Sequence, residues 1–174
     1  MDLGKLFLEH RKMDIGVEIG VQNGFNLKQI TEFWNGLVIG VDHWANMAEY
    51  EKAKEILQYR AVLLKGDSIR IGNQFTDESL DWIHIDAGHS YEEVKADFDT
   101  WYPKVRTGGV ISFHDYGVND CIGVKIFIDE YMRNHPDIRF SFTTEDFWRD
   151  VEYQTVWFIK PYSNINPMKP NVNS

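Results

Sequence analysis

The amino-acid sequence predicts an α/β fold in which a doubly wound, mostly parallel seven-stranded sheet is flanked by helices and ends in an antiparallel hairpin. Short β-rich segments alternate with segments whose apolar residues recur at helical spacing. Parallel neighbours need a long return connection, which a helix supplies with a right-handed crossover. Ligands bind beyond the carboxyl ends of the strands in such a sheet, so the functional residues are expected there.

Strands are expected where short apolar runs are bounded by turn-forming residues. The segments that meet this condition are 15–19, 37–41, 61–64, 80–85, 109–114, 138–143 and 153–159, the fifth following a turn at 107–109. Helices are expected over 25–34, 91–101 and 122–134, and helical patterns fill most other gaps. The apolar faces of these helices should pack on the sheet.

The chain ends differently from its alternating first part. His135, Pro136 and Asp137 interrupt the helical pattern, and the last two strands follow without a long helix between them, which predicts antiparallel pairing. Residues 161–174 are rich in Pro, Asn and Ser and cannot bury enough apolar surface to order themselves. We therefore predict one domain over residues 1–160 and a C-terminal tail over 161–174.

Charge and composition exclude several classes of protein. Acidic residues number 27 against 18 basic ones, a formal net charge of −9 without a basic cluster, which argues against a nucleic-acid partner. No apolar run approaches the roughly 20 residues that span a bilayer, so no membrane partner is expected. The single cysteine, Cys121, cannot form an internal disulfide and no signal-peptide pattern is present, so we expect a cytoplasmic protein.

Glycines bracket the turn that leaves the first predicted strand. Gly20 and Gly24 lack side chains that would keep a ligand away, and the next helix offers free N–H groups at its start. A dinucleotide turn reads G-x-G-x-x-G, whereas Gln22 stands here where a close pyrophosphate contact requires glycine. By itself the turn fits an ordinary strand-to-helix connection equally well.

Short polar residues end the next two strands. Asp42 follows the glycine turn by roughly the 20 residues at which a carboxylate meets ribose hydroxyls in nucleotide-binding domains. Its alternative role is to cap the following helix. Asp67 and Ser68 could contact an adenine edge or start a helix, with equal weight on each interpretation.

The fourth and fifth strands each end in a carboxylate and an imidazole. Asp86 and His89 follow the fourth strand, and His114 and Asp115 follow the fifth. Such a cluster suits proton abstraction and equally suits a divalent cation held by oxygen and imidazole ligands. A structural role stays open for each histidine.

Four segments carry a family resemblance when taken in order: 17–21, 40–44, 85–91 and 108–116. Together they resemble the class I methyltransferases, which bind S-adenosylmethionine (SAM) on a Rossmann-like sheet. The likeness spans about residues 14–160. It is greatest to a subgroup of bacterial and viral small-molecule and sugar O-methyltransferases, whose fourth and fifth strands end in similar I-D-G-x-H-x-Y and H-D-Y signatures.

The resemblance implies a cofactor-binding set along the carboxyl ends of the first four strands: Glu18, Gly20, Gly24, Asp42, Asp67, Ser68 and Asp86. The first three would shape the methionine pocket, Asp42 would bind the ribose hydroxyls, and the next two would lie near the adenine. Asp86 would face the methionine end or the reaction centre.

Metal-dependent relatives hold magnesium with a carboxylate after the fourth strand and an acidic pair after the fifth. Asp86, His114 and Asp115 stand at those positions, with an imidazole in place of one carboxylate. Because Mg²⁺ prefers oxygen, this replacement weakens the case for magnesium and leaves manganese, zinc or no metal open.

We therefore expect a SAM-dependent O-methyltransferase that acts on a small-molecule or glycan hydroxyl, with a sugar favoured because its high pKa calls for a base. The expected catalytic residues are Asp86, His89 and His114, with either histidine as the base. Aromatic residues that could stack on a sugar are Trp44, Tyr91, Tyr116, Phe147 and Trp148, although most such residues belong to cores.

The acceptor pocket is expected in the loops 115–120 and 143–152, and a second subunit could supply a lid. Two alternatives stay open. One is an NAD-dependent oxidoreductase on a related sheet, which Gln22 disfavours. The other is a SAM-binding module without turnover.

Overall fold

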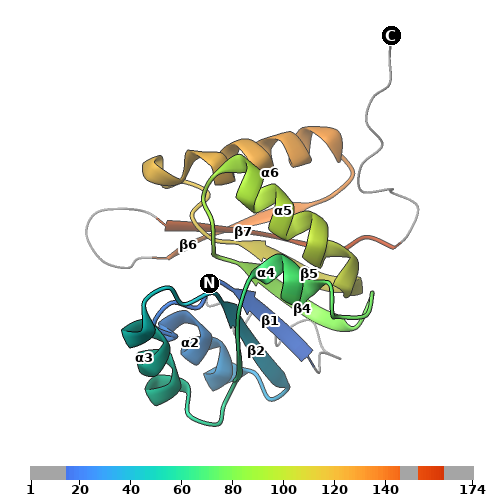
Figure 1. Ribbon diagram of the computed structural model, residues 1–174. Helices are drawn as coiled ribbons and strands as arrows, with labels where there is room; N and C mark the ends of the chain where they lie inside the picture. The colour runs from blue at the N-terminus through green and yellow to red at the C-terminus, as the bar shows by residue number, and fades with distance from the viewer. Residues whose placement is uncertain (1–14, 146–152, 163–174) are drawn as a thin grey trace.

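The computed structural model describes residues 15–145 and 153–162, and within them the chain forms one seven-stranded sheet (Figure 1). The strand order is β3-β2-β1-β4-β5-β7-β6. The strands are β1 (Ile15–Ile19), β2 (Leu37–Asp42), β3 (Val62–Lys65), β4 (Leu80–Ile85), β5 (Val105–Phe113), β6 (Phe140–Glu145) and β7 (Tyr153–Ile159). The first five pair in parallel, whereas β7 runs antiparallel to both β5 and β6. The predicted fold class and terminal hairpin are confirmed.

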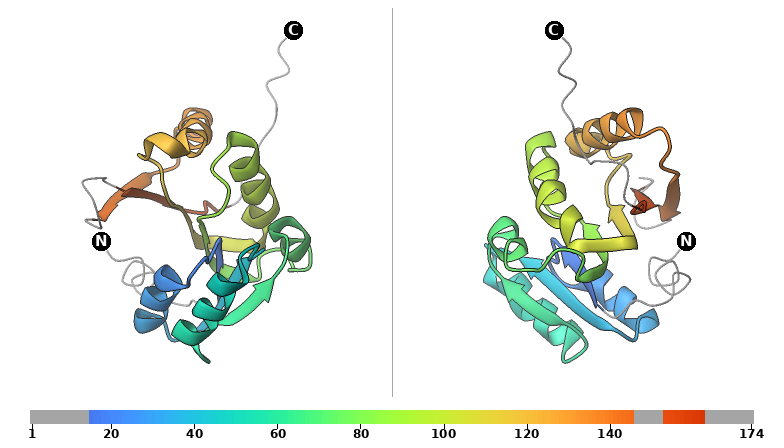
Figure 2. Two further views of the ribbon diagram at one scale, coloured as in Figure 1. Left: turned by 60° about the vertical axis from the view of Figure 1, so that its left-hand side comes forward. Right: turned by 90° about the vertical axis from the view of Figure 1, so that its right-hand side faces the viewer.

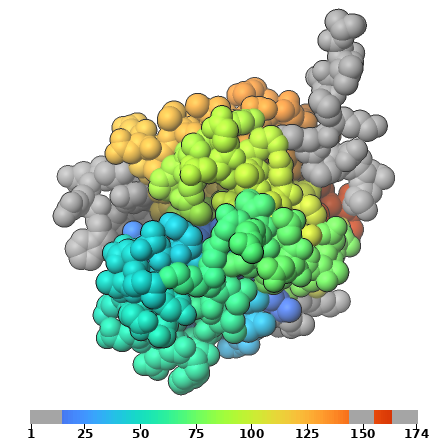
Figure 3. Space-filling model, viewed as in Figure 1, coloured from blue at the N-terminus to red at the C-terminus, as the bar shows by residue number. Residues whose placement is uncertain are grey.

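Helices cover both faces of the sheet (Figure 2). They are α2 (Phe25–Phe33), α3 (Met47–Leu57), α4 (Ser68–Gly72), α5 (Tyr91–Trp101) and α6 (Ile122–Asn134), with short 3₁₀ turns η1 (Tyr102–Lys104) and η2 (Asn119–Cys121). Two apolar clusters result, one beneath α2 and α3 and the other beneath α4, α5 and α6. In the space-filling view α5 and α6 form the upper part of the visible face, and α3 with the segment after it forms the lower left (Figure 3).

The central strand β4 is buried along its whole length, as expected for a parallel strand with helices on both sides. Its polar residues are nevertheless paired with neighbours. Asp81 accepts a hydrogen bond from the backbone N–H of Ile15 at 2.7 Å and pairs with Arg106 at 2.6 Å, which ties β4 to both flanking strands. His84, deeper in the same strand, belongs to the site described below.

The predicted turn at 107–109 is wrong, because these residues continue β5, which begins at Val105. The backbone N–H of Gly108 donates to the carbonyl of Lys160, and the N–H of Lys160 donates to Gly109. Pairing with a segment fifty residues later in the chain therefore overrides a local glycine signal. The other strand boundaries differ from prediction by two residues at most.

Some predictions fall outside the described residues. These are the loop aromatics Phe147 and Trp148, and nearly all of the predicted tail over 161–174. The domain boundary at residue 160 stays a prediction. In the described ranges, no helix combines the length and the apolar character that crossing a membrane requires.

Candidate cofactor and active site

A cavity of about 890 Å³ opens at the carboxyl ends of the parallel strands, a size typical of small-molecule sites. The sequence-predicted residues that line it are Glu18, Gly20, Asp42, Asp67, Ser68, Asp86, His89, His114 and Asp115. The parallel sheet thus brings together side chains that are far apart in the chain.

Glu18 lies near the end of β1 with only 1% of its surface exposed. Its Oε1 accepts a hydrogen bond from the side-chain amide of Asn26 on α2. Its Oε2 is buried and has no hydrogen-bond partner among the described residues. Burial, reinforced by the charge of Asp86, raises the pKa of Glu18 well above its usual value. An unpaired buried acceptor costs about 1–3 kcal/mol, so this oxygen is suited to a ligand that brings a donor.

The two turn glycines have different roles. Gly20 has a φ of +88°, and a Cβ there would lie 1.9 Å from the carbonyl oxygen of Asp86, so only glycine lets the two strand ends approach each other. Gly24 precedes α2 with a φ of +81° and faces Ala53 and Leu57 of α3. It is absent from the residues that line the cavity, and its predicted part in shaping the methionine pocket stays a prediction.

Asp42 organises the glycine turn from the end of β2. Its Oδ2 accepts from the backbone N–H groups of Val21 and Gln22 at 2.9 and 2.8 Å. Its Oδ1 accepts from the N–H of Trp44 at 2.7 Å. The alternative that Asp42 caps the next helix is wrong, because Asn46 caps α3. Trp44 is 1% exposed and donates its indole N–H to the carbonyl of Gln22, so it is not a stacking surface for a sugar.

Asp67 and Ser68 line the cavity and also start α4. Asp67 accepts from the N–H of Arg70 at 2.8 Å, so the capping role that the sequence left open is present. The hydroxyl of Ser68 donates to Asp97 of α5, whose pKa burial raises to about 6. Sequence reasoning missed Asp97, although an acidic residue on the apolar face of a helix is a usable signal.

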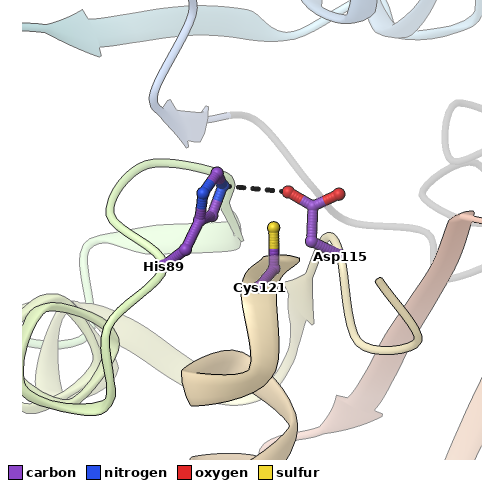
Figure 4. A group of neighbouring side chains, drawn as sticks. All are labelled: His89, Asp115 and Cys121. Carbon is purple, nitrogen blue, oxygen red and sulfur yellow. Dashed lines mark ion pairs between the residues drawn. The ribbon is translucent and has the colours of Figure 1, made fainter. Parts of the chain in front are cut away.

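The carboxylate of Asp115 joins the two predicted histidines. Its Oδ2 lies 3.0 Å from His89 Nε2 (Figure 4). Its Oδ1 lies 2.9 Å from His114 Nδ1. His114 Nδ1 also lies 3.5 Å from Asp86 Oδ1. Ligand atoms of Asp86, His114 and Asp115 fall within 4.8 Å of one another. The structure therefore brings together the side chains that the sequence proposed for catalysis and for a metal.

The surroundings of Asp115 favour its ionised form. Burial alone would raise its pKa, but the hydrogen bond with His114 and the charges of both histidines outweigh burial and lower it. Figure 4 shows the sulfur of Cys121, at the start of α6, beside the same carboxylate. Burial and neighbouring carboxylates raise the pKa of Cys121 to about 11, so the thiol keeps its proton and can donate to Asp115. Its position in the site was not predicted.

His84 is a second residue that the sequence did not flag. Its ring is fully buried in β4, and Nδ1 lies 2.9 Å from the hydroxyl of Ser112 on β5. Burial, together with the neighbouring His114, lowers the pKa of His84 to about 3, so the ring is neutral at pH 7. The two rings meet edge to face, with centroids 6.0 Å apart. In the sequence, His84 shares the strand 80–85 with a second polar residue, Asp81, and no spacing links it to the other site residues.

A family model described as a methyltransferase domain matches residues 17–116, which is more than half of the chain. This chain belongs to the methyltransferase-domain family. The match confirms the class I methyltransferase resemblance and includes every predicted site residue. The subgroup of sugar and viral enzymes stays a prediction.

Solved methyltransferase structures share the fold at low sequence identity. The O-methyltransferase from Bacillus cereus, in complex with S-adenosylhomocysteine (SAH), is 17% identical over 91% of this chain and 80% of that chain. Its TM-score is 0.70. TomG from Streptomyces achromogenes, in complex with SAM, is 15% identical over 91% and 79%, with a TM-score of 0.71. An rRNA methylase from Streptococcus thermophilus is 12% identical over 92% and 95%, with a TM-score of 0.68.

A curated relative matches only part of this methyltransferase. An uncharacterized protein, y4gI of Sinorhizobium fredii, is 37% identical over 67 residues. The match covers 38% of this chain and 7% of that much longer protein.

Proposed function

We propose that this methyltransferase transfers the methyl group of SAM to a hydroxyl oxygen, with a sugar or glycan as the acceptor. The observation that carries the proposal is the His89–Asp115 pair at the rim of the cavity that contains the buried acceptor of Glu18. The family match supports the reaction class, as do the Bacillus and Streptomyces O-methyltransferases, which share the fold and are bound to SAH or SAM.

The cavity residues fit the chemical groups of SAM. The unpaired Oε2 of Glu18 is suited to the ammonium of the methionine part, and Gly20 also lines the cavity. Asp42, Asp67 and Ser68 line the same cavity, where Asp42 would meet the ribose hydroxyls and the other two would lie near the adenine. When bound, SAM supplies an electrophilic methyl group on a sulfonium sulfur.

His89 is the better placed of the two candidate bases. Its side chain is 46% exposed, whereas that of His114 is 21% exposed. The ionised Asp115 accepts from His89 Nε2, which holds the proton on that nitrogen and leaves the Nδ1 lone pair to take a proton. The buried carboxylate also stabilises the imidazolium that forms. His114, which contacts the other oxygen of Asp115, would position that carboxylate. Asp86, which follows β4, would add negative charge beside His114.

The acceptor has a second, smaller cavity available beside His89. This cavity of about 620 Å³ is bordered by Glu93 and Asp120, whose carboxylates can accept hydrogen bonds from sugar hydroxyls, and by the half-buried ring of Tyr91. A polyhydroxylated acceptor fits this border better than a polyanion does. The net charge of −9 likewise disfavours a nucleic acid, although one structural neighbour is an rRNA methylase. A cytoplasmic location and a homo-oligomer in which a second copy closes the acceptor side complete the proposal.

Replacing His89 with Gln tests the proposed base. We expect kcat to fall by roughly 10² to 10⁴-fold while SAM affinity is unchanged, because the imidazole is needed for proton removal and not for cofactor binding. Methyl transfer from radiolabelled SAM to a panel of glycosides and phenols measures kcat, and calorimetry measures affinity. Glu92→Gln, on the exposed side of α5, is the matched control. Unchanged kcat in His89→Gln would reject the base, and SAM binding without transfer to any acceptor would favour a non-catalytic module.

Exhaustive chelation tests the role of a metal. Both oxygens of Asp115 already pair with histidines, so we expect activity to persist after dialysis against a chelator. Loss of activity that Mn²⁺ or Mg²⁺ restores would instead assign Asp86, His114 and Asp115 to a divalent cation, since their ligand atoms are close enough to share one. The same assay then ranks the two ions.

A further inference from the structure

Two fully buried acceptor atoms lie beside the cofactor cavity, one on β1 and one on β4. Within the described residues neither Glu18 Oε2 nor His84 Nε2 has a hydrogen-bond partner. An oxygen of Glu18, a ring nitrogen of His84 and an oxygen of Asp86 fall within 4.8 Å of one another. Glu18 and Asp86 line the cavity, whereas His84 is fully buried and is not among the lining residues.

The hydrogen bonds of Ser112 determine which nitrogen of His84 carries the proton. The single hydroxyl hydrogen of Ser112 is donated to the carbonyl of Ile83 at 3.1 Å. With that hydrogen on Ile83, we assign the 2.9 Å contact with His84 Nδ1 as a hydrogen bond that Nδ1–H donates. In the neutral ring, Nε2 is then a lone pair that requires a donor.

The three converging groups define the chemistry of their ligand. A carboxylate oxygen and an imidazole lone pair are both acceptors, and the second carboxylate, Asp86, adds negative charge. Leaving such acceptors buried and unpaired is unfavourable, so a group with several hydrogens, and preferably a positive charge, is expected between them. An alkylammonium, which has three hydrogens and no acceptor, meets this description.

We propose that His84 is a positioning residue for the cofactor, whose Nε2 accepts a hydrogen bond from the methionine ammonium of SAM or from a water held by that ammonium. This inference rests on the proposed function. It makes β4 part of the cofactor site through His84 inside the strand as well as through Asp86, which follows the strand. Glu18 and His84 would share the ammonium, and Ser112 would act through His84 by fixing its tautomer.

The test compares two ligands that differ in the group at issue. S-adenosylhomocysteine carries the ammonium, whereas 5′-methylthioadenosine lacks the amino-acid part. For His84→Phe, which keeps an aromatic ring, we expect the Kd of S-adenosylhomocysteine to rise about tenfold and that of methylthioadenosine to be unchanged. His84→Gln, which restores an acceptor oxygen, should recover part of the loss. Ser112→Ala should show the same pattern more weakly, and it carries the test if His84→Phe does not fold.

Nitrogen NMR of protein labelled in its histidines gives a readout that is independent of activity. The His84 resonances are assigned by their absence from the His84→Phe spectrum. We expect Nδ1 protonated, Nε2 unprotonated, and an Nε2 resonance that moves with S-adenosylhomocysteine and not with methylthioadenosine. A protonated Nε2 in the free protein, or equal loss of affinity for both ligands, would overturn the inference alone. Unaltered protein that binds neither SAM nor S-adenosylhomocysteine would overturn the proposed function as well.

Discussion

At Gly20 the backbone turns with positive φ directly against the carbonyl of Asp86. Two constraints therefore act on one residue: a left-handed conformation and a contact that leaves no space for a Cβ. Asp42 reinforces the same turn by accepting hydrogen bonds from two of its backbone N–H groups. The turn after β1, which lines the cofactor cavity, is thus fixed by the backbone contact of Gly20 and by the carboxylate of Asp42.

Replacing Gly20 with Ala should destabilise the protein more than the same change at Gly108. Both glycines have positive φ, which costs an alanine about 1–2 kcal/mol, but a Cβ at Gly108 meets nothing nearer than 3.6 Å, whereas a Cβ at Gly20 meets backbone at 1.9 Å. Urea unfolding of the two variants measures the difference. Equal losses would show that the strand end of Asp86 can move aside.

The connection from β4 to α5 presents Asp86 and His89 to the cavity and then starts a helix. The hydroxyl of Ser90 accepts from the N–H of Glu93, and the carboxylate of Glu93 accepts from the N–H of Ser90, which forms a capping box. The sequence S-x-x-E is visible without a structure, so this helix start and its bounds were predictable. By contrast, α4 is only five residues long, too short for a periodic pattern to reveal.

Loss of the Ser90 cap of α5 should lower both the stability of the protein and its rate of methyl transfer. We expect Ser90→Ala to lower the free energy of unfolding by about 1 kcal/mol, and to lower kcat because the preceding residue is the proposed base. Ser90→Thr keeps the hydroxyl and should restore most of both quantities. Equal behaviour of the alanine and threonine variants, in denaturation and in methyl transfer, would contradict a role for the cap.

At the scale of the whole molecule, the parallel sheet concentrates charge at one end. Carboxylates and histidines at the carboxyl ends of β1, β2, β4 and β5 meet there, whereas the imidazole of His84, deeper in β4, is neutral. Burial of a neutral imidazole links folding to pH. Because the pKa of His84 falls from 6.5 to about 3 on folding, the unfolded chain binds more protons between these values.

The stability contribution of His84 should therefore be fully present above pH 6.5 and be lost as pH falls toward 3. Where the two states differ by one proton, the slope is about 1.4 kcal/mol per pH unit. Glu18 opposes this trend, because its raised pKa removes stability as pH rises. Comparing unfolding of the unaltered protein and His84→Phe across this window isolates His84. A difference that does not change with pH would show that the ring is not neutral when folded.

The sequence by itself determined the order and type of the long elements, the terminal hairpin and the polar residues that line the cavity at the strand ends, because period, turn residues and strand-end polar residues are local signals. Only the tertiary structure decided that Gly24 packs on α3, that Trp44 is core, and that 107–109 continue a strand. It also decided that His84, Asp97 and Cys121 lie beside the site. These depend on contacts between residues distant in the chain, and on which side of an element is buried. Residue type and spacing do not contain that information.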